Sequence, residues 1–424
     1  MLPLRSNLAL AVDQGSFWWA VGIEDSFIAD PWHRTGRSLD EYELTDHYQR
    51  WQGDLDLVRA LGVRVMRYGL PWHRIAPGPQ QRDWSWCDRV MERLRDCGIE
   101  PILDLVHYGL PGWLNGAYLA PDFPRRMADH AAEVAQRYSW VRWFTPMNEP
   151  RIAAWYCGRL GWWPPYRASW RGFVAVLMAA CRGIVASARA IRQVRPEAVI
   201  AHVDASDLFV AADERLLAVS EHRQQLVFLA LDLIFGRVVG DHPLHGWLLD
   251  RGVTEADLDW FRLNASVPDV IGVNLYPMFT LKRLELVRDR VHVRMPYATG
   301  ELLEQVIEQY RDRYRLPLFV SETASRGAVV RRQRWLADSV AAVARLRDRG
   351  IPVLGYTWWP LFGLVAWSYR QGTRALDTYI QQFGLWDLRR DANGELARLP
   401  TDVAEDFRAL VSHGSAAVGS YRKR

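Results

Sequence analysis

Two glutamates stand in surroundings that suit acid–base and nucleophilic chemistry. Glu149 lies in the segment TPMNEP (residues 145–150) and Glu322 in FVSETA (residues 319–324), and each ends a run typical of a strand. A carboxylate is costly to bury there unless it is paired or used. Each alone would serve as the partner of an arginine, but the two together, with Asn148 beside Glu149, favour catalysis. Two carboxylates facing each other across a pocket are what glycoside hydrolysis requires, because one protonates the leaving oxygen while the other meets the developing positive centre.

The elements that must position these glutamates repeat along the chain. From residue 16 onward, short runs rich in Val, Ile, Leu, Trp and Phe alternate with longer stretches of helical period, which indicates repeated strand–helix units. The predicted strands cover residues 16–23, 63–69, 99–107, 140–147, 198–204, 269–276, 316–322 and 351–359. The predicted helices cover residues 46–61, 85–97, 125–138, 169–194, 215–236, 298–314, 330–349 and 401–412.

Parallel strands that are each followed by a helix close most naturally into a (β/α)8 TIM barrel of the α/β class. Strands four and seven of such a ring lie on opposite sides, so that Glu149 and Glu322 can face each other. The long loops over 109–124, 151–168, 277–297 and 360–400 follow strands, on the face where barrel enzymes carry their active sites. No Pro/Gly/Ser-rich linker interrupts the sequence, so we expect a single catalytic domain over 1–424 with short tails at 1–14 and 414–424.

Composition excludes several classes of protein. With 49% hydrophobic residues, 24% charged residues and a net charge of +4, the chain is typical of neither disordered nor low-complexity proteins. Charged residues interrupt every apolar segment before the roughly 18 residues of a membrane span, so no membrane partner is expected. Of the 53 basic residues only Lys282 and Lys423 are lysine, and basic blocks stay short, so nucleic-acid binding is not supported.

The cysteines and the N-terminus indicate a cytoplasmic protein. The apolar run between Arg5 and Asp13 is too weak for the core of a signal peptide. A reducing compartment is the simpler assumption for cysteines that show no metal-ligand spacing. These are Cys87, Cys97, Cys157 and Cys181. We expect neither a metal nor another cofactor.

The segments 145–150 and 320–323 resemble the two signature motifs of glycoside hydrolase family 1, the β-glucosidase family. The resemblance covers nearly the whole chain. Further matches are FWW (17–19), VMRYGLPWHRI (65–75), LVHYGLP (105–111), GVNLY (272–276), the stretch 356–367 and FGL (383–385). The resemblance implies a retaining β-glycosidase that hydrolyses O-glycosidic bonds of a small-molecule glycoside by double displacement.

The resemblance also implies the catalytic roles. Glu149 would be the general acid/base, which requires a raised pKa, and Glu322 would be the nucleophile, which must stay ionised. Arg67 would be the positive partner that keeps Glu322 ionised, and Tyr276 would donate its hydroxyl to the same carboxylate.

Other matching residues would bind the sugar. Asn148 would bond the 2-hydroxyl and His107 another ring hydroxyl, while Trp359 and Trp367 would form the floor and wall of the pocket. Further tryptophans are expected at strand ends where a sugar stacks, namely Trp18, Trp19, Trp143 and Trp358. Trp155, Trp162 and Trp163 follow Glu149, where an aglycone can rest.

Two departures from the family pattern concern the distal edge of the sugar. The family usually has a Gln soon after the first strand, but residues 22–27 read GIEDSF, and the usual Glu before the second Trp of strand eight is replaced by Ala366. Missing hydroxyl partners favour a sugar modified at its distal carbons, such as a deoxy, methylated or amino sugar. Glu24 and Asp25 are the candidates to replace the lost contacts, and an amino group would then be attractive.

Three alternatives stay open at this point. A transglycosidase uses the same double displacement with an alcohol in place of water. A catalytically weak sugar-binding barrel would fit the absence of the usual Gln and Glu that bind sugar hydroxyls. The presence of both catalytic carboxylates, Arg67 and Tyr276 argues against it. A barrel metal hydrolase would need histidines at strand ends, where His107 stands alone because His202 lies within strand five. The oligomeric state and the aglycone are open.

Overall fold

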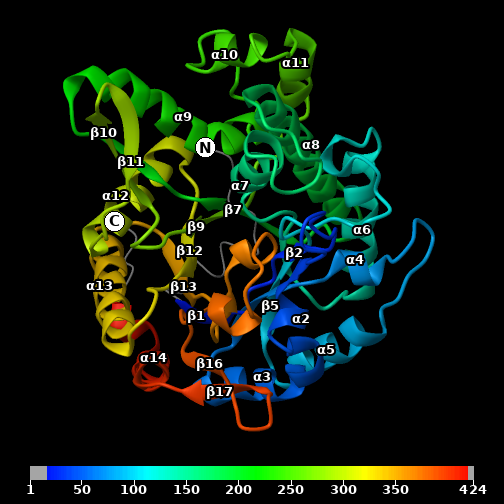
Figure 1. Cartoon of the computed structure of the whole chain (residues 1–424), viewed down its shortest axis with the longest axis vertical. Coiled ribbons are helices and arrows are strands. Elements are labelled where there is room, and N and C mark those ends of the chain that lie inside the picture. Colours follow the sequence, from blue (N-terminus) through cyan, green and yellow to red (C-terminus); the bar gives the residue numbers. More distant parts are fainter. Residues whose placement is uncertain (1–16, 419–424) are drawn as a thin grey trace.

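The computed structural model describes residues 17–418 and contains a closed barrel of parallel strands (Figure 1). The barrel strands are β1 (Trp18–Gly22), β4 (Val65–Gly69), β5 (Glu100–Asp104), β6 (Trp143–Thr145), β7 (Val199–Ala205), β9 (Val270–Asn274), β12 (Leu318–Thr323) and β13 (Val353–Trp358). They pair in chain order, and β13 closes the ring against β1. All eight predicted strands are confirmed. The predicted tail at 1–14 lies outside the described residues, and residues 414–418 form the 3₁₀ turn η6.

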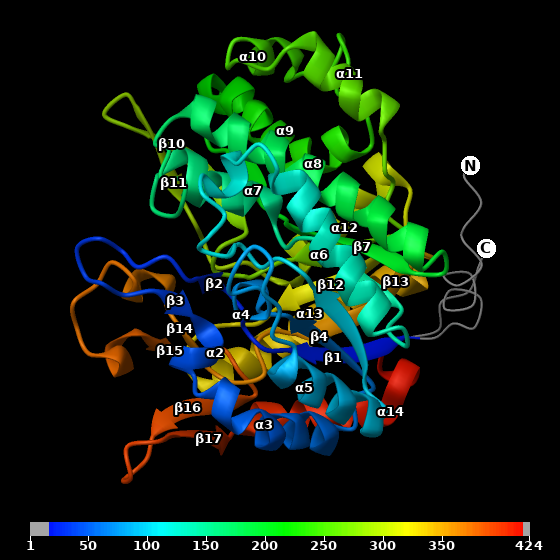
Figure 2. The ribbon, with the colours of Figure 1, turned by 90° about the vertical axis from the view of Figure 1, so that its right-hand side faces the viewer.

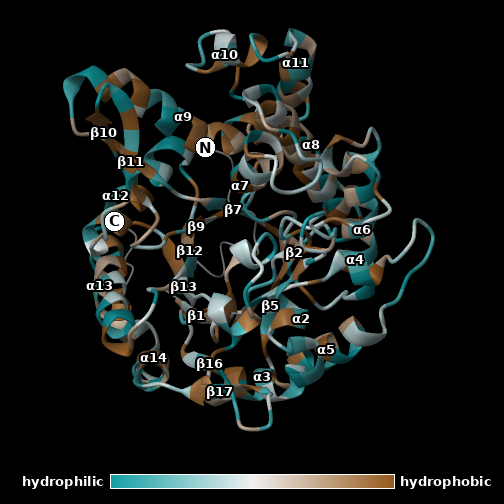
Figure 3. Ribbon diagram, in the orientation of Figure 1, coloured by the Kyte–Doolittle hydropathy of each residue, from teal (hydrophilic) through white to brown (hydrophobic). Residues whose placement is uncertain are grey.

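A ring of helices surrounds the barrel (Figures 1 and 2). Its members are α3 (His47–Leu61), α5 (Ser85–Asp96), α6 (Phe123–Arg137), α8 (Trp170–Val194), α9 (Leu217–Ile234), α12 (Gly300–Tyr314), α13 (Val329–Asp348) and α14 (Asp402–His413). Hydrophilic and hydrophobic turns alternate along these helices (Figure 3), as expected where one face packs on strands and the other meets water. The predicted helices and the TIM-barrel class are therefore confirmed.

The segments between these helices and strands carry shorter elements. In the first half of the chain they are β2 (Phe27–Ile28), β3 (Leu39–Asp40), α2 (Glu41–Leu44), α4 (Trp72–Ile75), η1 (Ala117–Leu119), α7 (Pro150–Ala153), the π-helical turn η2 (Ala154–Arg159), β8 (Leu208–Ala211) and η3 (Glu214–Leu216). In the second half they are α10 (His245–Leu249), α11 (Glu255–Leu263), β10 (Leu281–Val287), β11 (Arg290–Arg294), β14 (Leu364–Val365), η4 (Trp367–Tyr369), η5 (Leu376–Tyr379), β15 (Ile380–Gln381), β16 (Trp386–Arg390) and β17 (Leu396–Pro400).

The two catalytic candidates lie at the carboxyl ends of their strands. Glu322 is the penultimate residue of β12 and is in register with Asn274 at the end of β9. Glu149 follows β6 and begins α7, and Asn148 forms a β-bridge with Val203. The barrel therefore brings the ends of four strands to one rim.

Several tryptophans expected at the sugar site lie elsewhere, which corrects the prediction for them. Trp18 and Trp143 are the first residues of β1 and β6, and their rings meet 5.3 Å apart, so they belong to the amino-terminal end of the barrel. Trp19 is buried against Tyr356. The sequence shows that a tryptophan lies in a strand. Its distance from the carboxyl end of that strand depends on where pairing with the neighbouring strands begins, and this register is set only when the barrel closes.

Helix α8 is the one helix within residues 17–418 that is long and apolar enough to cross a membrane. Of the most apolar 18-residue stretch of this helix, 67% is buried inside the protein. Its buried residues join α6 and α9 in one apolar cluster, including Leu177, Ile184 and Phe173. Its apolar character is therefore that of a core helix.

Candidate active site

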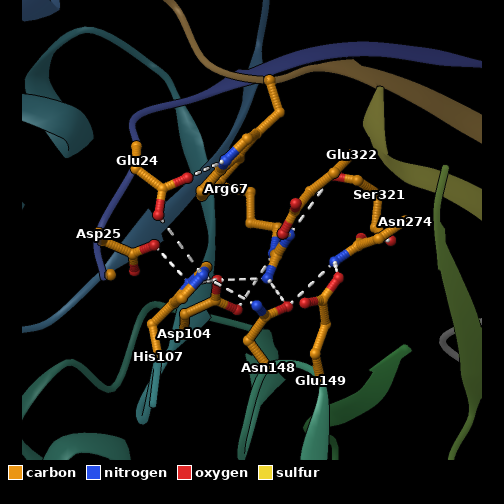
Figure 4. Close-up of polar contacts among 12 residues, drawn as sticks. Glu24, Asp25, Arg67, Asp104, His107, Asn148, Glu149, Asn274, Ser321 and Glu322 are labelled. Atoms are coloured by element: carbon orange, nitrogen blue, oxygen red, sulfur yellow. Dashed lines mark hydrogen bonds and ion pairs between the residues drawn. The ribbon is translucent and has the colours of Figure 1, made fainter. Parts of the chain in front are cut away.

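Glu322 is held by a cation and a phenol. The side chain is 5% exposed, and one carboxylate oxygen forms an ion pair with Nη1 of Arg67, which lies on β4. The other oxygen accepts a hydrogen bond of 2.7 Å from the hydroxyl of Tyr276. Arg67 is fully buried and also pairs with Asp104 at 2.7 Å. In Figure 4 its guanidinium lies at the centre of the network, between Glu322 and Asp104.

Glu149 is held by neutral groups. The residue is 7% exposed, and its carboxyl group accepts a hydrogen bond of 2.8 Å from Nδ2 of Asn274 and another from the hydroxyl of Tyr108. Its backbone has a φ of +43°, and that of Tyr108 has a φ of +69°. Such angles are strained for residues with a side chain and persist only where the surroundings impose them, which is common at active sites.

Asn148 connects the two carboxylates. Its Oδ1 accepts from Nη2 of Arg67 at 2.7 Å and from Nδ2 of Asn274 at 3.2 Å, so its amide orientation is determined. Its Nδ2 therefore faces Nε2 of His107 at 2.9 Å and the hydroxyl of Tyr108 at 3.1 Å. The hydrogen bonds of Asn148 thus join the groups that hold Glu322 to those that hold Glu149.

The two carboxyl groups differ in how they hold a proton. Burial raises the pKa of both Glu149 and Glu322, and the charge of Glu149 raises the pKa of Glu322 further. The Arg67 guanidinium and the Tyr276 hydroxyl stabilise the ionised form of Glu322, whereas the two donors to Glu149 carry no charge. The partners of the two carboxyls therefore favour ionisation of Glu322 over ionisation of Glu149. This difference is what a nucleophile and an acid need.

His107 lies over two buried acids. Its Nδ1 is 2.5 Å from Asp25 and 3.6 Å from Asp104, and its ring stacks on Trp359 at 5.8 Å. Burial raises the pKa of Asp25 to about 6 although His107 opposes the shift. One donor atom each from Asp25, Asp104 and His107 lies within 4.8 Å of the others, close enough for a metal ion. Asp104 already forms an ion pair with Arg67, and the positive charge of that guanidinium would repel a divalent metal ion. The three residues therefore fit an ion network better than a metal site.

Glu24 and Trp359 both lie beside His107. Trp359 is fully buried, and its Nε1 donates to Glu24 at 2.9 Å. Gly22 permits this packing, because a Cβ there would stand 2.1 Å from the Trp359 ring. The carboxylate of Glu24 is 4.0 Å from Nε2 of His107.

Trp367 lies toward the loops. The half-buried ring packs edge-on against Tyr108 at 5.4 Å, Tyr156 at 5.3 Å and Trp163 at 5.2 Å. Trp163 is buried and Trp162 is 46% exposed, while Trp155 packs on Trp170. Trp358 is fully buried and bonds the carbonyl of Phe383. Of the tryptophans expected at the sugar, Trp359 lies directly in the polar network and Trp367 contacts it through Tyr108.

The structure brings nine of the ten predicted site residues into one polar network and adds Trp367 at its edge. The same network includes residues with no predicted role, above all Tyr108 and Asn274. Asn274 stands in the GVNLY segment at the end of a predicted strand, so a polar residue at a strand end was the available signal. For Tyr108 the signal was its place directly after His107.

Comparisons with known proteins agree with this geometry. The model of glycosyl hydrolase family 1 matches residues 19–285, more than half of the chain. A β-glucosidase from Agrobacterium sp. is 27% identical over 405 residues, which cover 86% of this chain and 84% of the relative. Beta-glucosidase 47 from Arabidopsis thaliana is 23% identical over 417 residues, covering 85% and 75%.

Solved structures share the fold. The β-glucosidase from Thermotoga maritima in complex with deoxynojirimycin superposes with a TM-score of 0.80 at 19% identity, covering 96% of this chain and 98% of that chain. The family match over residues 19–285, together with relatives aligned along most of their length, establishes the classification that the motifs predicted. The chain belongs to glycosyl hydrolase family 1 and is a β-glucosidase-like glycoside hydrolase.

Proposed function

We propose that this glycosidase works with retention of configuration, through a covalent glycosyl-enzyme intermediate. The observation that carries the proposal is the unequal setting of the two carboxyls. Glu322 has a guanidinium and a phenol as partners, which suits an ionised nucleophile, and Glu149 has neutral partners, which suits a proton donor.

The chemistry then runs in two steps. An oxygen of Glu322 attacks the anomeric carbon while Glu149 gives its proton to the departing glycosidic oxygen. Glu149, now ionised, takes a proton from water, whose oxygen attacks the same carbon and releases Glu322. Asn148 has its amide fixed by Arg67, so an N–H that now faces His107 or Tyr108 can turn to the sugar 2-hydroxyl without the side chain first being ordered.

We further propose that the sugar is modified at its distal carbons, as a deoxy, methylated or amino sugar. The stretch from Gly22 to Phe27 lacks the usual Gln, and Ala366 stands where a Glu is usual. One relative, 33% identical over 32% of this chain, is a bifunctional β-D-glucosidase/β-D-fucosidase from Bifidobacterium breve. D-Fucose lacks a hydroxyl at carbon 6, which is a modification of the proposed kind.

A stereochemical experiment tests the mechanism. Proton NMR of the first sugar released from an aryl β-glycoside shows the β-anomer for retention and the α-anomer for inversion. Glu322→Gln should abolish turnover, and Glu149→Gln should slow glycosides with poor leaving groups most. Release of the α-anomer would refute retention. Added alcohols that become the main acceptors would identify a transglycosidase, and bound sugar without turnover would identify a binding protein.

A screen of substrates tests the sugar. Aryl β-D-glucoside, β-D-fucoside and amino-sugar glycosides are compared by kcat/KM. Fastest turnover of the unmodified glucoside would contradict the modified sugar.

We also propose a cytoplasmic location and a single domain. All four cysteines are free in the structure, and the barrel strands run from Trp18 to Trp358 along most of the chain. Fractionation of the source cells tests the first proposal, and a single cooperative unfolding transition supports the second.

A further inference from the structure

Glu24 is a buried carboxylate that faces the sugar site without a cation in direct contact. It is 7% exposed, and its oxygens accept from Nε1 of Trp359 at 2.9 Å and from the hydroxyl of Ser26 at 2.6 Å. The nearest basic nitrogen, Nε2 of His107, stands 4.0 Å away. A buried carboxylate without a bonded cation keeps much of its desolvation cost.

A second buried acid, Glu41 on α2, forms a hydrogen bond with Ser26, the serine that also binds Glu24. The backbone N–H of Glu41 donates to the carbonyl of Ser26 at 3.2 Å, while the Ser26 hydroxyl holds Glu24. Oε2 of Glu41 accepts from the backbone N–H of Val365 at 3.0 Å, and its buried Oε1 has no hydrogen-bond partner within residues 17–418. Val365 directly precedes Ala366, so the Glu41 carboxylate binds the backbone of the segment in which the family pattern supplies a glutamate.

The charges of the site do not balance. The acids of the labelled network in Figure 4 are Glu24, Asp25, Asp104, Glu149 and Glu322, and its basic groups are Arg67 and His107. Even with Glu149 protonated and His107 charged, the acids exceed the cations. Arg67 is engaged by Asp104 and Glu322, and Nδ1 of His107 by Asp25. Glu24 is thus left without a cation in direct contact. Burial, followed by the charge of Glu24, raises the pKa of the neighbouring Glu41 well above its usual value.

We propose that the pocket recognises a sugar that carries an ammonium group on carbon 3 or carbon 4, and that Glu24 and Glu41 are the residues that select it. The inference rests on the proposed glycosidase function and names its substrate class. An ammonium group would be the missing cationic partner of Glu24, and its charge would also offset the buried acid Glu41. A hydroxyl at the same carbon would leave the excess charge in place.

The test uses matched 4-nitrophenyl β-glucosides that differ at one carbon. Each set has a hydroxyl, an amino or an acetamido group, at carbon 3 in one set and at carbon 4 in the other. The acetamido sugar has the nitrogen without the charge. We expect the amino sugar of one set to exceed its hydroxyl counterpart in kcat/KM by roughly tenfold or more, as for a hydrogen bond between charged groups, and the acetamido sugar to be the poorest. A hydroxyl sugar that equals or exceeds both amino sugars would overturn the proposal.

Isosteric variants test the two residues. Glu24→Gln keeps the shape and removes the charge, so the ratio of amino to hydroxyl kcat/KM should fall by roughly 10- to 100-fold. Glu41→Gln should lower the same ratio, and Glu43→Gln should leave it unchanged, because Glu43 lies on the same helix but pairs with Arg74 at the surface. A ratio that Glu24→Gln leaves unchanged would overturn the role of Glu24. Thermal unfolding of each variant establishes that it is folded.

Two further measurements separate this proposal from the proposed function. A 2-deoxy-2-fluoro glucoside should trap a covalent intermediate on Glu322, detected as an added mass on its peptide. Calorimetry compares binding of free 3-amino-3-deoxyglucose, 4-amino-4-deoxyglucose and glucose. Trapping without preference for an amino sugar refutes only the amino-sugar inference, whereas an amino-sugar preference in calorimetry without trapping or turnover refutes only the retaining glycosidase.

Discussion

The hydroxyl of Tyr108 offers a direct test of how the acid/base is controlled. It is buried, accepts a hydrogen bond from Nδ2 of Asn148 at 3.1 Å and donates to Glu149. Replacing Tyr108 with Phe removes this hydroxyl and keeps the ring, which packs against Trp163 and Trp367. Because a Phe has the same bulk at the strained φ of +69°, the backbone has no new reason to move.

The sign of the effect follows from which form of Glu149 is stabilised. The Tyr108 hydroxyl donates to the carboxylate and so favours its ionised form, opposing the effect of burial on the pKa of Glu149. A hydrogen bond to a charged group contributes about 1.5–3 kcal/mol, and one pKa unit corresponds to about 1.4 kcal/mol. Tyr108→Phe should therefore raise the pKa of Glu149 by about 1–2 units. Since Glu149 acts as an acid when protonated, activity should persist to higher pH.

The assay is the pH dependence of kcat/KM for an aryl glycoside, which reports groups of the free enzyme. We expect the basic limb to move up by about 1–2 pH units in Tyr108→Phe. Tyr276→Phe is the matched variant, because it removes a phenol that donates to Glu322 and should move the acidic limb up instead. A basic limb that stays in place or moves down in a folded Tyr108→Phe protein would refute the reasoning, as would a shift of the same limb in both variants.

Three further substitutions or labels test other parts of the structure. Gly22→Ala should lower kcat/KM by about 100-fold, because its Cβ would displace the ring of Trp359, and unchanged kinetics would contradict that packing. Arg67→Met leaves buried acids unpaired and should lower the free energy of unfolding in urea by about 3–5 kcal/mol, whereas a loss below about 1 kcal/mol would argue against a buried ion pair. Iodoacetamide should label Cys97 in the native protein and spare the other three thiols, because burial raises the pKa values of those three. Peptide mapping that finds one of the three labelled before Cys97 would contradict this expectation.

The eight strands and their helices could be predicted from the sequence because each depends on a local pattern. The strand segments are short apolar runs, and the helices carry a period that neighbouring residues reveal. Glu149 and Glu322 were recognisable for a similar reason, since each sits in a short motif at the end of such a run. The order of the pattern then implied a closed ring, and the ring placed both glutamates at the same rim.

The outcome for the tryptophans shows where local pattern fails. Trp18 and Trp359 both lie in or beside predicted strands, yet one is at the amino-terminal end of the barrel and the other is in the site network. Which end a residue occupies depends on where strand pairing begins, and this is settled by neighbours hundreds of residues away. The pairing of Trp18 with Gly355 is an example.

By itself the sequence determined the family, the barrel and the two carboxylates, because motifs and periodicity are properties of neighbouring residues. Only the tertiary structure decided what each carboxylate contacts. Arg67 meets Glu322 across 255 residues of chain, and Asn274 meets Glu149 across 125. The unpaired acids Glu24 and Glu41 became visible in the same way, because the absence of a cation beside them is a property of the closed barrel and of its folded loops.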